Sequence, residues 1–254
     1  MQCVLKFQIF GTTKNKMMQI NEKIILKKIR KTKKENNKIC IIAIDGITCS
    51  GKSLYADLLK KRLKKYYKDI FVLSKDLFLI SRKKRIKVTN KIGKKFSGEQ
   101  NKLHYDRRKL DKLISVLKQK DKSSIRLKGL YNRKNGKNDK NLYFDFKKNS
   151  VIIFEGLFIL DDLKKIKPIY KILVTNNVYN SLARKIERIR DKKISIQKVV
   201  TEFTNLHLKS MRNYLIKNDF NESYSGEETK FMKIKNGKSK QINLINIFFK
   251  KHLF

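Results

Sequence analysis

The stretch Gly46-Ile47-Thr48-Cys49-Ser50-Gly51-Lys52-Ser53 decides the fold, because it has the spacing G-x-x-x-x-G-K-S. Glycines at both ends of such a loop let the backbone curl until its N–H groups point inward, where they can hold phosphate oxygens. A lysine and a hydroxyl side chain at the last two positions can reach the β- and γ-phosphates and a Mg²⁺ ion. The stretch therefore predicts a loop that binds a nucleoside triphosphate.

The segments on either side of the loop support this interpretation. The apolar run before it predicts a strand over 39–45 that is buried on both faces, as in a parallel sheet. After it, apolar residues at helical spacing predict a helix from Gly51 to about Tyr66, whose dipole favours phosphate at its start. If the loop were only a turn, Lys52 and Ser53 would have no evident role. The residues expected to bind the nucleotide are Gly46, Ile47, Thr48, Cys49, Ser50, Gly51, Lys52, Ser53 and Leu54.

Further strands and helices alternate along the chain. Apolar runs predict strands at 70–74, 151–154 and 170–174, with a short one at 124–127. Helical periodicity predicts helices at 107–119, 178–191 (capped by Asn177) and 196–216. The charged segment 82–102 has no clean period and is interpreted as a mobile insertion, and 132–141 as a loop or hairpin turn. Alternation of this kind is typical of βαβ units, so we predict an α/β fold built on a parallel sheet.

The composition is strongly basic, with 64 Lys+Arg against 22 Asp+Glu and a formal net charge of +42 over 254 residues. Such a charge often indicates nucleic acid or an anionic membrane as the partner. Here the lysines are spread through the chain and accompany abundant Ile, Asn, Phe and Tyr, a mixture that AT-rich codons produce. Codon bias on solvated faces therefore explains the positive charge at least as well as a polyanionic partner does. We do not expect nucleic acid as a partner.

Cysteines and histidines give no sign of a disulfide framework or a metal centre. Cys3, Cys40 and Cys49 have neither pairing logic nor ligand spacing, and the three histidines are isolated. One cysteine falls in a predicted strand and one in the loop, which indicates a reducing, cytoplasmic location. No run approaches the ~18 apolar residues that a membrane span needs.

Two carboxylates follow predicted strands at the edge where parallel sheets bind ligands. Asp76 comes after the strand at 70–74, and Glu155 comes after the strand at 151–154. Phosphoryl transfer needs Mg²⁺ on the phosphates and a group that orients or deprotonates the attacking hydroxyl. Ser53, Glu155 and Asp76 are candidate Mg²⁺ partners, and Asp76 is the candidate base. Each residue also has a structural interpretation. Asp76 could be a turn residue that ends a strand, and Glu155 could be the ion-pair partner of a nearby lysine.

A cationic helix end supplies two further candidates. Arg184 and Arg188 lie four residues apart and so share one face of the helix predicted from Val178. A helical lid that closes over ATP would bring such arginines to the γ-phosphate. If there is no such lid, the same residues indicate only a surface helix in a lysine-rich protein.

From Ile39 to Ile216 the chain resembles the uridine kinase and phosphoribulokinase group of P-loop kinases. The likeness consists of these motifs in order: Ile44-Asp45-Gly46 with Gly51-Lys52-Ser53, Leu73-Ser74-Lys75-Asp76-Leu77-Phe78, Tyr105-Asp106, Tyr131-Asn132, Phe154-Glu155-Gly156-Leu157 and Arg184-Lys185-Ile186-Glu187-Arg188. The resemblance implies a P-loop NTPase-type sheet with helices on both faces and a helical lid. It also implies Asp76 as base and Mg²⁺ contact, Glu155 as a second Mg²⁺-side carboxylate, Arg184 and Arg188 as lid residues, and Tyr131 beside the acceptor.

The chain departs from the family pattern on the acceptor side. Leu79 stands where the family's D-x-F-Y has tyrosine, and Gly136 stands where the nucleoside enzymes have histidine. Glu99 is the candidate for the acidic contact that uridine kinases make with the ribose hydroxyls. The resemblance divides the chain into a basic N-terminal extension (1–38), a P-loop kinase domain (39–217) and a C-terminal tail (218–254) that could pack on it.

Three functions are compatible with these features. The leading one is a kinase that uses ATP and Mg²⁺ to phosphorylate a hydroxyl of a small-molecule acceptor, most like a uridine kinase acting on a nucleoside. The second is a nucleotide-binding protein without kinase turnover, which the departures at Leu79 and Gly136 suggest. The third is a nucleic-acid-associated ATPase, which only the charge suggests.

Overall fold

A computed structural model describes residues 22–36, 39–92, 99–119, 123–147, 150–188, 195–227 and 230–252. The helices are α1 (Glu22–Asn36), α2 (Lys52–Leu63), α3 (Arg82–Ile92), α4 (Arg107–Leu117), α5 (Ile159–Asp162), α6 (Val178–Glu187), α7 (Ile196–Glu202), α8 (Lys209–Lys217) and α9 (Gly237–His252). The strands are β1 (Cys40–Asp45), β2 (Ile70–Ser74), β3 (Ser123–Tyr131), β4 (Asn138–Phe146), β5 (Val151–Glu155), β6 (Tyr170–Thr175), β7 (Glu222–Glu227) and β8 (Lys230–Lys233). Two 3₁₀ turns, η1 (Lys75–Phe78) and η3 (Glu99–His104), precede α3 and α4, and a π-helical segment (Phe203–Leu208) joins α7 to α8.

The centre of the molecule is a six-stranded sheet in the order β2-β5-β1-β6-β7-β8. Its first five strands are parallel, and β8 pairs with β7 antiparallel. Strand β1 is buried along its whole length, because strands of a parallel sheet covered on both faces have no solvent side. Strands β3 and β4 form a separate antiparallel hairpin. The predicted α/β fold with a parallel sheet is confirmed.

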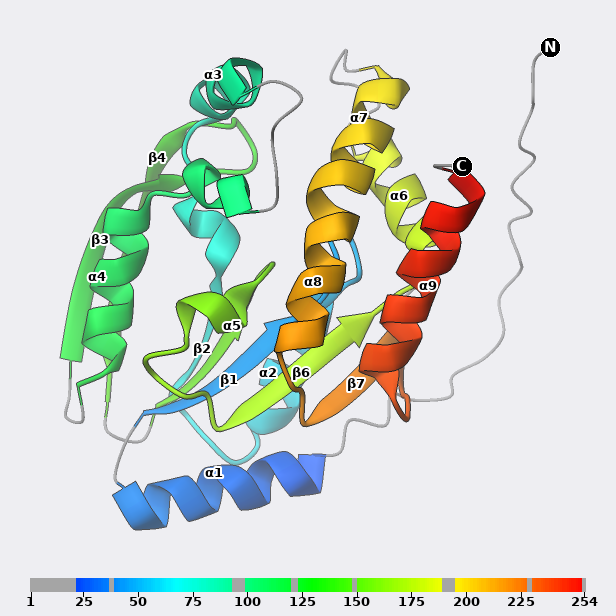
Figure 1. Ribbon diagram of the computed structural model, residues 1–254. Coiled ribbons are helices and arrows are strands. Elements are labelled where there is room, and N and C mark those ends of the chain that lie inside the picture. Colours follow the sequence, from blue (N-terminus) through cyan, green and yellow to red (C-terminus); the bar gives the residue numbers. More distant parts are fainter. Residues whose placement is uncertain are drawn as a thin grey trace.

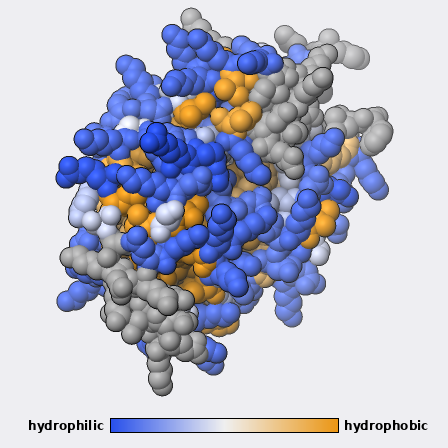
Figure 2. Space-filling model, turned by 60° about the vertical axis from the view of Figure 1, so that its left-hand side comes forward, coloured by the Kyte–Doolittle hydropathy of each residue, from blue (hydrophilic) through white to orange (hydrophobic). Residues whose placement is uncertain are grey.

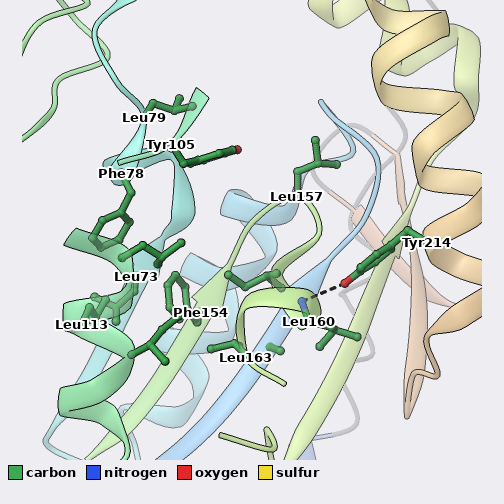
Figure 3. Packing of buried hydrophobic residues seen from close by; sticks show 14 of the residues in the cluster. Leu73, Phe78, Leu79, Tyr105, Leu113, Phe154, Leu157, Leu160, Leu163 and Tyr214 are labelled. Atoms are coloured by element: carbon green, nitrogen blue, oxygen red, sulfur yellow. Dashed lines mark hydrogen bonds between the residues drawn. The ribbon is translucent and has the colours of Figure 1, made fainter. Parts of the chain in front are cut away.

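Helices cover both faces of the sheet (Figure 1). On one face, α1 and α2 pack on the central strands through a cluster that includes Ile25, Ile29, Tyr55 and Leu59. On the other face, α4, α5, α8 and α9 contribute to a larger cluster around Phe154. Figure 3 shows part of that larger cluster, where Leu73 and Phe78 approach Phe154 from the β2 side. The central strands therefore lie between two separate hydrophobic cores, one on each face of the sheet.

Local signals in the sequence explain the helices that were predicted correctly. The α4 helix buries Leu110, Leu113, Ile114 and Leu117, the set expected from their spacing. The Asn177 side chain accepts a hydrogen bond from the Tyr179 N–H at 2.9 Å and caps α6 as predicted. The helix predicted over 196–216 is present as α7, the π-helical segment and α8. Residues 189–191 of the predicted helix 178–191 lie outside the described part.

One expectation about irregular segments was wrong. Residues 82–92, expected to belong to a mobile insertion, form α3, whose turns are fixed by tertiary contacts of Arg85 and Thr89 that periodicity does not reveal. Residues 132–137 are the hairpin turn expected within 132–141, while 138–141 belong to β4, and the short strand expected at 124–127 lies within the longer β3. Within 218–254, β7 pairs with β6, so this segment packs on the domain and extends the sheet. The polar sequence Glu222-Ser223-Tyr224-Ser225 lacks the apolar run by which the other parallel strands were found.

The surface is hydrophilic over most of the face that carries α4 and the β3–β4 hairpin. Figure 2 shows hydrophobic side chains there only in small separate areas. None of the described helices combines the length and apolar character needed to cross a bilayer. The Cys40 thiol is buried in β1, where it donates to the Ile29 carbonyl oxygen at 3.9 Å. The Cys49 thiol is partly exposed in the phosphate-binding loop, and Cys3 lies outside the described residues.

We predict that Phe154→Ala lowers the free energy of unfolding by about 3–5 kcal/mol, because truncation of this fully buried ring leaves a cavity in the larger core. Urea denaturation would measure the change. Tyr143, which is 60% exposed on β4, gives a control ring of similar size, and Tyr143→Ala should cost less than about 1 kcal/mol. Equal losses in the two variants would contradict the described core.

Candidate active site

The phosphate-binding loop follows β1 and ends at the start of α2. Gly46 has φ of +150°, and a Cβ atom there would lie 2.1 Å from the Val174 carbonyl oxygen, so only glycine fits beside β6. Gly51 has φ of +98° at the N-cap of α2, and Cys49 adopts φ of +60°. The loop thus combines backbone conformations that side chains disfavour, as a phosphate cradle requires.

Lys52 is held close to the loop. Its Nζ donates hydrogen bonds to the carbonyl oxygens of Gly46, at 3.0 Å, and Ile47, at 2.8 Å. The side chain is 9% exposed, so the ammonium group is confined to the mouth of the cradle. An incoming phosphate would offer the same group charged acceptors in place of two neutral carbonyl oxygens.

A buried carboxylate that sequence reasoning did not select anchors the start of the loop. Asp45 accepts hydrogen bonds from the Gly46 N–H (2.7 Å), the Phe158 N–H (3.1 Å), the Ile159 N–H (2.9 Å) and the Tyr214 hydroxyl. Burial raises the pKa of Asp45, while the bond from Tyr214 opposes that shift. The Tyr214 hydroxyl also accepts from the Leu160 N–H, which Figure 3 shows as a dashed line. The position of Asp45 at the end of a strand was the sequence signal that could have identified this residue.

Glu155 lies between the ends of β1 and β2. The register pairs it with Ile44 on one side and Ser74 on the other. The Ser53 hydroxyl donates to Glu155 Oε1 at 3.1 Å. Desolvation raises the pKa of Glu155, the nearby Asp76 charge adds to the rise, and the Lys52 charge opposes it. The predicted carboxylate and hydroxyl therefore meet directly beside the loop.

Asp76 lies in η1, immediately after β2, and is partly exposed. Its carboxylate makes an ion pair with Arg133 at 2.5 Å, and Arg133 comes from the turn between β3 and β4. The charge of Asp76 also acts on Glu155 and on the buried hydroxyl of Tyr105, whose pKa is raised mainly by desolvation. Asp76 follows Ser74, the register partner of Glu155, by two residues, so the two carboxylates lie at the ends of neighbouring strands. No pattern in the sequence singled out Arg133, which lies in a polar turn.

Tyr131, predicted to lie beside an acceptor, forms a second cluster with Arg85. Tyr131 is 5% exposed, and its hydroxyl accepts a hydrogen bond from Arg85 Nη2 at 2.7 Å. The Arg85 guanidinium also stacks over the Tyr131 ring, with Cζ 4.7 Å from the ring centre. Glu99 begins η3, but its side chain lies outside the described part of the structure.

Deeper ion pairs fix this half of the site to the sheet. Lys75 Nζ lies 2.6 Å from Asp162 Oδ2 and donates to the Leu157 carbonyl oxygen at 2.8 Å. Both side chains are almost fully buried, and Arg107 from α4 also pairs with Asp162. These contacts join η1, α4 and α5, so the position of Asp76 depends on three elements that are distant in sequence.

Of the two predicted lid arginines, Arg188 reaches the loop. Its Nη1 lies 3.5 Å from Cys49 Sγ, at the end of α6. Arg184 is one turn earlier on the same helix and is partly buried. In Figure 1, α6 and α7 stand on one side above the carboxyl ends of the central strands, and α3 with the β3–β4 hairpin stands on the other. Leu54, at the start of α2, is 39% exposed.

A hard cation is the metal that this donor set could hold. Ser53 and Glu155 supply a hydroxyl and a carboxylate in contact, and Asp76 adds a second carboxylate in the same space. Within the described residues, no group of three or more His, Cys, Asp and Glu side chains forms a metal cage. Two carboxylates and a hydroxyl fit Mg²⁺, which keeps several waters and binds substrate phosphates with few protein ligands.

Solved structures share this fold. The chain is similar to a provisionally assigned fructose transport system kinase from Silicibacter sp. TM1040, with 17% identity and a TM-score of 0.52 over 77% of this chain and 94% of that one. It is also similar to the YGR205w protein, with 16% identity and a TM-score of 0.53 over 79% and 86%. Phosphoribulokinase from Rhodobacter spheroides aligns with 15% identity and a TM-score of 0.49 over 74% and 70%.

The first two likenesses concern the fold alone, and they agree with the α/β fold predicted from the sequence. No family model matches the chain, and no curated protein matches it in sequence. The comparison of folds therefore places the chain among structures with this architecture, and the roles of individual residues have to be argued from the geometry.

We predict that Tyr214→Phe lowers the free energy of unfolding by about 1–3 kcal/mol, because Asp45 loses one of its four donors inside the core. Urea denaturation near pH 7 would measure the loss. Tyr143→Phe removes a hydroxyl from a ring that is 60% exposed and should be nearly neutral. If both variants match the unaltered protein, the Asp45 cluster does not stabilise the fold.

We predict that protonation of His104 destabilises the protein in acid. Desolvation, together with the charge of Arg85, lowers the pKa of His104 from 6.5 to about 4. Because the folded-state pKa is lowered, this contribution to stability is fully present above pH 6.5 and is lost as pH falls towards 4. Urea denaturation across pH 7.5–4.5 should therefore show a smaller decline for His104→Gln than for the unaltered protein. Parallel declines would show that desolvation does not lower the pKa of His104 in the folded protein.

Proposed function

We propose that the protein is a kinase that transfers the γ-phosphoryl group of ATP to a hydroxyl of a small-molecule acceptor. The observation that carries this proposal is the meeting of Lys52, the Ser53–Glu155 pair and Asp76 at the carboxyl ends of β1, β2 and β5. A nucleotide-binding module without chemistry would need the loop but not a second carboxylate facing it across the site.

The nucleotide would lie in the loop from Gly46 to Ser53. The loop N–H groups and the start of α2 would hold the phosphates, and Lys52 would exchange the carbonyl oxygens of Gly46 and Ile47 for β- and γ-phosphate oxygens. Arg188 and Arg184 would approach the γ-phosphate from α6, where Arg188 already reaches Cys49.

Mg²⁺ would be held by Ser53 and Glu155, with Asp76 as a further partner, directly or through water. When bound, the ion neutralises negative charge on the β- and γ-phosphates. The buried Glu155 carboxylate already carries a raised pKa from desolvation and from Asp76, so a cation at this point would favour its ionised form.

In the transfer itself, the acceptor hydroxyl oxygen forms a bond to the γ-phosphorus while the bond from that phosphorus to the β–γ bridging oxygen breaks. The hydroxyl proton passes to the Asp76 carboxylate, and ADP leaves with the bridging oxygen. Tyr131 and Glu99 would lie beside the acceptor. Uridine, which the family resemblance suggests, is one acceptor to test.

We predict that Asp76→Asn lowers kcat by about 10²–10⁴-fold with ATP and the best acceptor of a panel, because the amide cannot accept the hydroxyl proton. The panel would contain uridine, cytidine, pantothenate and sugar phosphates, with product formation followed by coupled release of ADP. Binding of ATP, measured by calorimetry, should be retained. Asp57→Asn removes the same charge from an exposed position on α2 and should leave kcat unchanged.

Two results would reject the proposal. If Asp76→Asn and Asp57→Asn have the same turnover as the unaltered protein, Asp76 is not the base. If the protein binds ATP but consumes none with any acceptor, it is a nucleotide-binding protein without kinase turnover.

A further inference from the structure

The candidate base is paired with a cation that the phosphoryl-transfer chemistry does not need. Arg133 extends from the β3–β4 turn and makes the 2.5 Å ion pair with Asp76. The charge of Asp76 is the main cause of the raised pKa of Arg133, and that of Glu155 adds to it. While this pair is closed, one oxygen of the Asp76 carboxylate is occupied by the guanidinium. A hydroxyl could use that oxygen only after Arg133 had moved to another partner.

A second guanidinium borders the same space. Arg85 donates to the hydroxyl of Tyr131, which ends β3 two residues before Arg133, so both guanidinium groups belong to the same end of the β3–β4 hairpin. Arg85 is held in place by Tyr131, and its Nε is buried with no hydrogen-bond partner among the described residues. Within the same part of the chain, Arg85 forms no ion pair with a carboxylate. A buried N–H donor without an acceptor is costly, and an anion is the ligand that would satisfy it.

The balance of charge on this side of the site favours an anionic ligand. Arg85 and Arg133 border the space, and the only carboxylate paired with either among the described residues is Asp76. If a neutral acceptor drew the Asp76 carboxylate to its hydroxyl, Arg133 would lose its partner. An acceptor that carries a carboxylate or phosphate would supply the missing partner, and guanidinium groups bind both in a fork geometry.

We propose that the acceptor carries a negatively charged group, and that this group takes Arg133 from Asp76 and so frees the base. Arg133 and Arg85 hold the anion, and the Asp76 carboxylate turns to the acceptor hydroxyl. A neutral acceptor leaves the ion pair closed and that oxygen of Asp76 occupied. This inference rests on the proposed kinase function, and it replaces the nucleoside with an anionic alcohol as the expected acceptor.

The test compares three pairs of acceptors that differ in charge: pantothenate with pantothenol, D-glycerate with glycerol, and D-ribulose 5-phosphate with D-ribulose. Calorimetric titration would measure the binding of each acceptor to the protein, and coupled ADP release would measure kcat/KM for each acceptor. We expect the anionic member of at least one pair to bind and react at least about 10-fold better. The first two pairs test whether the charged group is a carboxylate, and the third tests whether it is a phosphate.

Arg133→Gln should weaken binding of the preferred anion by about 10- to 100-fold, the range for a hydrogen bond to a charged group. It should change binding of the neutral member by less than about 3-fold. Lys134→Gln removes the same charge from the next position of the same exposed turn and should preserve the preference for the anion. Arg133 is on the surface, so a thermal unfolding curve and retained ATP binding would show that the variant is folded.

The binding and kinetic readouts separate the two hypotheses. A preference for anions that disappears in Arg133→Gln, without turnover of any acceptor, would reject the kinase but keep the anion site. Turnover of neutral acceptors at least equal to that of their anionic partners would keep the kinase and overturn the anion site. The anion site would also be overturned if the two members of every pair bound equally or not at all. The same holds if Lys134→Gln had an effect as large as that of Arg133→Gln.

Discussion

The buried carboxylate of Asp45 holds together the parts of the molecule that the site requires. A charged group this deep is costly unless donors surround it, and Asp45 has three backbone N–H groups and the Tyr214 hydroxyl. Those donors come from the phosphate-binding loop, the turn into α5 and the helix α8. The carboxylate therefore fixes the start of the loop relative to both the strand end that carries Glu155 and the helix above it.

The site has two halves that are stabilised differently. The phosphate half consists of one continuous segment, from β1 through the loop to α2, in which Lys52 and Ser53 are placed by local backbone geometry. The half proposed to bind the acceptor is assembled from η1, α3 and the β3–β4 hairpin, which meet through tertiary contacts such as Arg133 with Asp76 and Arg85 with Tyr131. Differences in acceptor can therefore arise in the second half while the first stays intact.

Ion pairs hold several cations in place in a protein with a formal charge of +42. Asp162, for example, pairs with both Lys75 and Arg107. The face of the molecule drawn in Figure 2 is mostly hydrophilic. The charge that matters to the chemistry is the local balance between Asp76, Glu155, Lys52, Arg85 and Arg133, and the net charge of the chain does not reveal it.

The sequence alone determined the parallel sheet, the phosphate-binding loop and the placement of Asp76 and Glu155 at strand ends, because each depends on a signal that is local in the chain: an apolar run, a glycine spacing, an acid after a strand. Only the tertiary structure decided the rest. Strand β7 is polar and α3 has weak periodicity, so each is specified by its neighbours and not by its own pattern. Asp76 and Arg133 are 57 residues apart, and their contact exists because the β3–β4 hairpin packs beside β2. A pairing of that kind depends on distances in the folded protein, which sequence spacing does not contain.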